Sequence, residues 1–219
     1  MTEQRAIHAA LLILLCGHCD FLGLQEIVAA LGLRRYHLLG QSWGGILGYE
    51  FLRAGGGAGA QEGEGCQSFI ISNTPTSVPQ VERDAEGLVA ALGDPALFSS
   101  THECRLPQRP QPLLDAYAHA GSVWRGTDAI KGWTLQARPP APAPGGGAPT
   151  DDAGQTMLAT PVLVLRGEHD FVTADNQRGW SDVFGRVRFK SLPDSSHHTL
   201  LEKREAYLEV VDAFCGEFD

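Results

Sequence analysis

The sequence has few of the features that would indicate a disulfide-rich, membrane-bound or nucleic-acid-binding protein. Its five cysteines are scattered over 219 residues and odd in number, which does not suit a disulfide framework and is typical of a reducing compartment. Acidic residues (26) outnumber basic ones (17), so the formal charge of −9 argues against a nucleic-acid or membrane partner. The apolar run at residues 9–15 is too short to cross a bilayer. We expect a cytoplasmic protein.

Patterns typical of metal and cofactor binding are also missing from the sequence. Cys16 and Cys19 form one C-x-x-C pair, but no second ligand pair follows at zinc spacing. The glycine-rich residues 55–65 lack the Lys-Ser/Thr of a phosphate loop and follow a predicted helix rather than a strand. The sequence therefore predicts neither a metal ion nor a cofactor.

Short apolar segments alternate with segments of helical spacing along most of the chain. With 219 residues, of which 43% are hydrophobic, the chain can form one domain with a sizeable core. The alternation of strand, helix and strand predicts βαβ units and a mainly parallel sheet. Strands are predicted at residues 33–39, 68–72, 161–165 and 187–192, and helices at 20–31, 43–52, 81–92, 113–120, 174–184 and 201–214.

Residues 77–157 differ in character, because prolines interrupt the helical pattern and residues 138–149 form a Pro/Gly-rich stretch that cannot pack. We interpret this region as a small helical lid with a linker, inserted between strands and called the predicted lid below. The two parts of the core are then residues 1–76 and 158–219. The glycine-rich residues 55–65 are predicted to be a flexible insertion without a packed role.

Residues 40–45 read Gly-Gln-Ser-Trp-Gly-Gly, directly after one predicted strand and directly before a helix. This Gly-x-Ser-x-Gly pattern resembles the nucleophile elbow of α/β-hydrolases, a sharp turn that raises a serine hydroxyl above the edge of the sheet. A Cβ atom at Gly40 or Gly44 would collide with the facing backbone. Because the chain contains 26 glycines, the pattern needs an acid and a histidine downstream to be meaningful.

Ser42, Asp170 and His197 follow each other in the order of an α/β-hydrolase triad, each just past a predicted strand. Ser42 would attack a carbonyl, His197 would transfer the proton, and Asp170 would orient the imidazole. The backbone N–H of Trp43 would donate to the oxyanion. Asp170 is alternatively a helix cap, and His198 competes with His197. The other histidines are interpreted as structural or solvent-exposed: His18, His37, His102, His119 and His169.

Several segments together resemble one family of serine peptidases, from about Asp20 to the end of the chain. They are Gly-Gln-Ser-Trp-Gly-Gly at 40–45, Ile-Ser-Asn-Thr at 71–74, His-Glu-Cys-Arg at 102–105, the strand and loop at 161–173, and Ser-Ser-His at 195–197 followed by Glu202. They are similar to segments of the proline iminopeptidase (prolyl aminopeptidase) family, which has the α/β-hydrolase fold. The last segment favours His197 over His198.

The resemblance implies a small peptide substrate with a free amino end, usually proline, whose amino group is held by carboxylates of the lid. Glu103 and Asp128 are the candidates in this sequence, since a buried ammonium group needs a paired carboxylate. The residues that could line an apolar proline pocket are Trp43, Trp124 and Trp133. The sequence gives no indication of the oligomeric state.

The sequence departs from the family pattern before Asp20. An α/β-hydrolase normally has several strands ahead of the elbow and a His-Gly-Gly-type loop that supplies a second oxyanion donor. Only nineteen residues precede Asp20, so we expect an N-terminally truncated relative with a partial sheet that lacks its first strands. Loss of one oxyanion donor costs about 3–4 kcal/mol in the transition state. An esterase-like α/β-hydrolase and a non-catalytic truncated remnant are therefore the alternatives.

Overall fold

The chain forms a four-stranded, wholly parallel sheet with the strand order β1-β2-β3-β4. The structure is a computed structural model that describes residues 21–59, 61–119, 130–136 and 157–219. The strands are β1 (Arg35–Gln41), β2 (Gly65–Ser72), β3 (Val162–Gly167) and β4 (Val187–Leu192). The four strands expected from the sequence and their parallel arrangement are confirmed.

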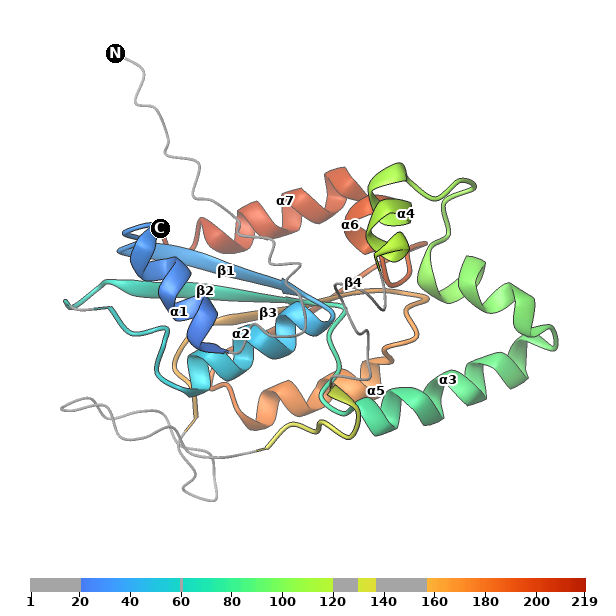
Figure 1. Cartoon of the computed structure of the whole chain (residues 1–219), viewed down its shortest axis with the longest axis horizontal. Coiled ribbons are helices and arrows are strands. Elements are labelled where there is room, and N and C mark those ends of the chain that lie inside the picture. The colour runs from blue at the N-terminus through green and yellow to red at the C-terminus, as the bar shows by residue number, and fades with distance from the viewer. Residues whose placement is uncertain (1–20, 60, 120–129, 137–156) are drawn as a thin grey trace, which may run out of the picture.

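Helices cover both faces of the sheet, so the molecule has three layers (Figure 1). One face carries α1 (Phe21–Ala30), α2 (Trp43–Arg53) and α5 (Ala174–Gln177), which continues into the 3-10 helix η4 (Arg178–Asp182). The opposite face carries α7 (Arg204–Cys215). Each crossover between parallel strands thus contains a helix, as parallel pairing requires.

The apolar run in β2 is buried because helices cover both of its faces. Phe69 and Ile71 point to the α2 side, where Trp180 belongs to the same cluster, and Ile70 points to the α7 side against Tyr207. All three strand residues have no exposed surface. A strand buried on both faces reads as a continuous apolar run, which explains why this one could be recognised in the sequence.

The described residues 78–118, which follow β2, are mostly helical and lie beyond the carboxyl ends of the strands (Figure 1). The elements are α3 (Val78–Leu92), η1 (Pro95–Leu97), η2 (Ser99–Glu103) and α4 (Gln111–Ala118). The helices expected near 81–92 and 113–120 are therefore confirmed. The division of the chain at 77–157 remains a prediction, and the Pro/Gly-rich residues 138–149 lie outside the described residues.

The prediction of a single helix at 174–184 is wrong, because α5 ends at Gln177 and a 3-10 helix follows. Asn176 and Gln177 are buried, and their side chains bind the loop after β2 instead of supporting a regular helix. The Asn176 Oδ1 atom accepts from the Thr76 backbone N–H at 2.8 Å, and Gln177 Nε2 donates to the Thr74 carbonyl at 3.2 Å. Tertiary hydrogen bonds thus override a helical pattern that contains weak helix formers.

The C-terminal helix expected at 201–214 is in fact two helices. A short α6 (Thr199–Glu202) ends before α7 begins at Arg204, and Lys203 between them has an extended φ of −134°. The Glu202 carboxylate is drawn back toward the preceding loop, where Oε1 accepts from the Ser196 hydroxyl at 2.8 Å. The bond ties the end of α6 to the histidine-bearing loop at the point where the helix is interrupted.

The expectation that residues 55–65 have no packed role is also wrong. Gly65, with φ +98°, donates its N–H to the Arg34 carbonyl at 2.6 Å and begins β2. The Cys66 N–H donates to the Gly57 carbonyl at 2.9 Å, and Glu64 pairs with Arg34. The glycine-rich turn is therefore tied to the start of the sheet.

The three cysteines in the described residues, Cys66, Cys104 and Cys215, are free thiols. Cys16 and Cys19 lie outside the described part of the chain. Among the helices that the structure describes, none combines the length and the apolar character needed to cross a bilayer.

We expect Phe69→Ala to lower the free energy of unfolding by about 3–5 kcal/mol, because a fully buried aromatic ring is replaced by a cavity. Phe189→Ala is the matched control, since Phe189 lies on β4 with 48% of its surface exposed. Urea unfolding followed by circular dichroism measures both. Equal losses for the two variants would contradict the assignment of the core.

Candidate active site

Ser42 lies in the turn between β1 and α2 with a backbone φ of +53°, which is uncommon for a residue other than glycine. Its N–H donates to the Ser72 carbonyl at 2.8 Å, and its own carbonyl accepts from the Gly45 N–H at 3.0 Å. These bonds hold the strained turn in place. A strand-to-helix turn with positive φ at serine is the geometry of a nucleophile elbow.

The glycines around Ser42 are required by close backbone approach. A Cβ atom on Gly40 would overlap the backbone of Gly44, and one on Gly45 would overlap the Thr74 side chain. The collision expected at Gly40 is confirmed, and Gly45 is a second contact that connects the elbow to the end of β2. The sequence pattern at 40–45 therefore has a steric origin.

Asp170 and His197 are brought together although 27 residues separate them. His197 Nδ1 lies 2.9 Å from Asp170 Oδ1, and both residues are buried. The ring of Phe171 stacks on the His197 ring with centroids 4.2 Å apart. Because Nδ1 is hydrogen-bonded to the carboxylate, Nε2 of the imidazole can act as the proton acceptor.

The elbow and the histidine loop (residues 193–198) are in contact. Gln41 directly precedes Ser42, and its Nε2 atom donates to the His197 carbonyl at 3.1 Å. The Ser42 hydroxyl and the His197 ring, which both belong to the described residues, are not hydrogen-bonded to each other. Such bonds in enzymes without substrate are often long and tighten only when substrate binds.

Asn73 is a site residue that the sequence analysis missed. Its Nδ2 donates to Asp170 Oδ2 at 2.7 Å and also lies 3.2 Å from the Ser196 carbonyl. Asp170 Oδ1 accepts in addition from the Val172 N–H at 3.0 Å. The buried carboxylate thus has partners on both oxygens. The sequence signals were the polar Asn-Thr pair directly after the apolar run of β2 and the family resemblance of residues 71–74.

Trp43 is the first residue of α2, where backbone N–H groups have no partner within the helix. Its N–H therefore has no helical partner, and the positive end of the helix dipole favours negative charge next to Ser42, where the carbonyl oxygen of a bound substrate would become an oxyanion. The assignment of this N–H as an oxyanion donor stays a prediction.

Glu103 lies next to the histidine loop, since its carbonyl accepts from the His198 N–H at 3.1 Å. Its Oε2 atom accepts from Arg109 Nη2 and from the Ser99 hydroxyl, both at 2.7 Å. Partial burial acts to raise the pKa of Glu103, but the hydrogen bonds from Ser99 and Arg109 outweigh it and hold the pKa below its ordinary value. Asp128, the other candidate, lies outside the described residues.

His198, which competes with His197 in the sequence, is partly buried. Its Nε2 lies 2.9 Å from the hydroxyl of Tyr117 on α4. Burial, with a smaller contribution from the neighbouring His197, lowers the pKa of His198 to about 4. His198 is therefore neutral at pH 7. Burial, followed by the Glu103 carboxylate, raises the pKa of Tyr117.

His102 is structural, which is one of the two interpretations given for it above, whereas Trp133 differs from expectation. His102 is buried, and its Nδ1 lies 2.7 Å from the His169 carbonyl, so it supports the loop that carries Asp170. Trp133 packs against Tyr49 at the core on the α2 side, and its Nε1 donates to Glu50 at 3.2 Å. Trp133 therefore contributes to the core rather than to a pocket beside Ser42. Trp124 lies outside the described residues.

Comparisons with known proteins agree with this arrangement, although no protein-family model matches the chain. A proline iminopeptidase from Lactobacillus delbrueckii subsp. bulgaricus is 24% identical in an alignment of 212 residues, which covers 86% of this chain and 68% of that protein. The crystal structure of the proline iminopeptidase from Mycobacterium smegmatis matches with a TM-score of 0.64 and 26% identity, covering 89% of this chain and 69% of the other. The chain has the α/β-hydrolase fold.

This α/β-hydrolase resembles the proline iminopeptidases, as its sequence segments predicted. A thermophilic esterase also matches, with a TM-score of 0.54 and 15% identity over 90% of this chain and 71% of the other. At that identity the match shows the fold alone. The comparisons therefore support the α/β-hydrolase superfamily more strongly than any one substrate.

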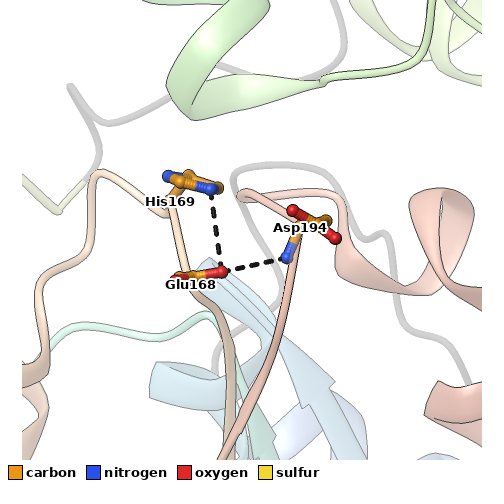
Figure 2. A group of neighbouring side chains, drawn as sticks. All are labelled: Glu168, His169 and Asp194. Carbon is orange, nitrogen blue, oxygen red and sulfur yellow. Dashed lines mark hydrogen bonds and ion pairs between the residues drawn. The ribbon is translucent and has the colours of Figure 1, made fainter.

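One group of side chains in the described part of this α/β-hydrolase could hold a metal ion. The ligand atoms of Glu168, His169 and Asp194 lie within 4.8 Å of one another. Figure 2 shows Glu168 Oε2 between the other two residues, 3.7 Å from His169 Nε2 and 3.1 Å from the Asp194 backbone nitrogen. Asp194 also faces the Lys203 ammonium at 4.0 Å. The sequence-based expectation of no metal ion remains a prediction.

We expect Gly40→Ala to destabilise the protein by about 1–3 kcal/mol, because its Cβ would overlap the backbone at Gly44. Gly87→Ala is the matched control. Gly87 lies within α3, and nothing approaches its Cβ position within 4 Å, so alanine should stabilise that helix by about 0.5–1 kcal/mol. Thermal unfolding of both variants measures the difference, and a stabilised Gly40→Ala would contradict the elbow geometry.

Proposed function

We propose that this α/β-hydrolase is a serine hydrolase that releases N-terminal proline from peptides through an acyl-enzyme. The observation that carries the proposal is the 2.9 Å contact between Asp170 and His197, beside a serine held at positive φ. A buried carboxylate, an imidazole and a strained serine, placed after β3, β4 and β1 of one parallel sheet, are the parts that acyl transfer needs. The similarity to proline iminopeptidases supports the choice of substrate.

In the proposed reaction, Ser42 Oγ bonds to the substrate carbonyl carbon as its proton passes to His197 Nε2. The Trp43 N–H stabilises the negative charge on the carbonyl oxygen. The imidazolium then gives its proton to the leaving amine, and the C–N bond breaks. Water attacks the acyl-enzyme by the same route in reverse, with His197 taking its proton and returning it to Ser42 as the ester bond breaks.

Glu103 is the proposed ligand for the amino group of the substrate. Arg109 and Ser99 fix one of its oxygens, Oε2, whereas no hydrogen bond to Oε1 is made within the described residues. The lowered pKa keeps this carboxylate ionised well below pH 7. An oriented carboxylate near His197 suits a substrate ammonium group placed beside the scissile carbonyl. Asp128 remains a second candidate on sequence alone.

The alternative function is hydrolysis of small acyl esters. The contact that favours it is the ion pair between Glu103 and Arg109, with 2.7 Å between Oε2 and Nη2. This pair neutralises the Glu103 charge in part and so weakens its attraction for a substrate ammonium. An ester substrate would use Ser42, His197 and Asp170 in the same way but would need no carboxylate partner.

We expect the protein to release a chromophore from a prolyl anilide, and Ser42→Ala to abolish turnover because the attacking oxygen is removed. A fluorophosphonate probe should label the unmodified protein and leave Ser42→Ala unlabelled. Ser181→Ala, at an exposed serine of η4, is the control and should be labelled normally. Absence of labelling in the unmodified protein would favour a non-catalytic remnant.

We expect Glu103→Gln to raise KM for the prolyl anilide by about tenfold or more, since a charge-assisted hydrogen bond contributes about 1.5–3 kcal/mol. Hydrolysis of a short acyl ester, which carries no ammonium group, should change little. Glu86→Gln, at an exposed position of α3, is the matched control. Equal losses on both substrates would contradict an amino-binding role, whereas cleavage of the ester but not of the prolyl anilide, unchanged in Glu103→Gln, would support the esterase alternative.

A further inference from the structure

The histidine loop is paired with η2 of the predicted lid through its main chain. The His197 N–H donates to the His102 carbonyl at 3.2 Å, and the His198 N–H donates to the Glu103 carbonyl at 3.1 Å. Two successive bonds of this kind fix the backbone direction at His197. The proposed base is therefore held in part by residues that lie outside the sheet.

The side chain of His198 extends this attachment to a second element of the predicted lid. His198 Nε2 lies 2.9 Å from the Tyr117 hydroxyl on α4, and the two rings meet edge to face with centroids 6.0 Å apart. Arg109 stacks over the Tyr117 ring at 5.6 Å and pairs with Glu103. A connected set of contacts thus joins η2, α4 and the histidine loop.

His198 also packs directly on the proposed base. Its ring meets the His197 ring at 75° with centroids 5.5 Å apart, while Phe171 stacks on His197 at 4.2 Å. Together with the bond from Nδ1 to Asp170, these contacts leave the His197 ring little freedom to turn. Misplacement of a reacting group by about 1 Å can cost about a hundredfold in rate.

We propose that His198 is a positioning residue for His197 and that it acts through its hydrogen bond to Tyr117. The inference rests on the proposed role of His197 as the base for Ser42. When the Tyr117 bond is lost, the histidine loop keeps its main-chain bonds to η2 but loses its attachment to α4. The imidazole of His197 then samples orientations in which Nε2 does not face Ser42.

The role requires a neutral His198, because His197 becomes positively charged in each step of acyl transfer. The charged or titratable groups around His198 are His197, Glu103, Arg109, Asp170 and Tyr117. Burial has the largest effect and favours the neutral ring. A neutral imidazole can bond to Tyr117 without opposing the charge that develops on its neighbour.

The test compares His198→Phe, His198→Gln and Tyr117→Phe at pH 7.5 by the rate at which a fluorophosphonate labels Ser42, and by kcat and KM for the substrate that is turned over. We expect His198→Phe and Tyr117→Phe each to slow labelling and lower kcat about tenfold, with KM nearly unchanged. His198→Gln, whose amide can still bond to Tyr117, should recover most of the rate.

The double variant His198→Phe/Tyr117→Phe should be no slower than the slower single variant, because both changes remove the same bond. Tyr36→Phe is the matched control: its hydroxyl lies 3.4 Å from the Gly56 carbonyl, away from the site, and labelling should be unaffected. Thermal unfolding checks that the variants are folded. If His198→Phe does not fold, Tyr117→Phe still tests the proposal, because it removes a single hydroxyl.

The outcomes separate this inference from the proposed function. Normal labelling of the unmodified protein together with wild-type rates in Tyr117→Phe and His198→Phe overturns the positioning role and leaves the serine hydrolase standing. Independent, additive losses in the double variant also overturn it. Absence of any labelling or turnover in the unmodified protein overturns both.

Discussion

A buried carboxylate connects the ends of three neighbouring strands. Asp170, which follows β3, accepts hydrogen bonds from Asn73 after β2 and from His197 after β4. A carboxylate buried this deeply is costly unless it is paired and hydrogen-bonded, so the loops on either side must approach it. The hydrogen bonds that satisfy the Asp170 carboxylate therefore hold the three loops together and also set the orientation of the His197 imidazole.

The sheet and the elbow could be predicted because their signals are local in sequence. β2 is a continuous apolar run, as expected for a parallel strand covered on both faces, and Gly40 marks the point where two backbones meet. Asp170 and His197 followed from chain order, since the carboxyl ends of parallel strands meet along one edge. The structure adds the hydrogen bond between them.

The contacts that complete the site join residues far apart in the chain, and no local sequence pattern predicts them. Asn73 lies 97 residues from Asp170, and Tyr117 lies 81 residues from His198. The helix expected at 174–184 failed for the same reason, because Asn176 bonds to a loop 100 residues away. Sequence alone could not show that α4 packs against His198, so its contact with Tyr117 was not expected.

The two strands that precede Asp170 and His197 differ in burial. Almost every residue of β3 is buried, whereas residues 188–191 of β4 are exposed. Segments with few buried apolar contacts open locally at free energies well below that of global unfolding. Asp170 follows the protected strand and His197 follows the unprotected one. We therefore expect local opening of β4 to disturb the histidine loop, which carries the proposed base, before the loop that carries Asp170.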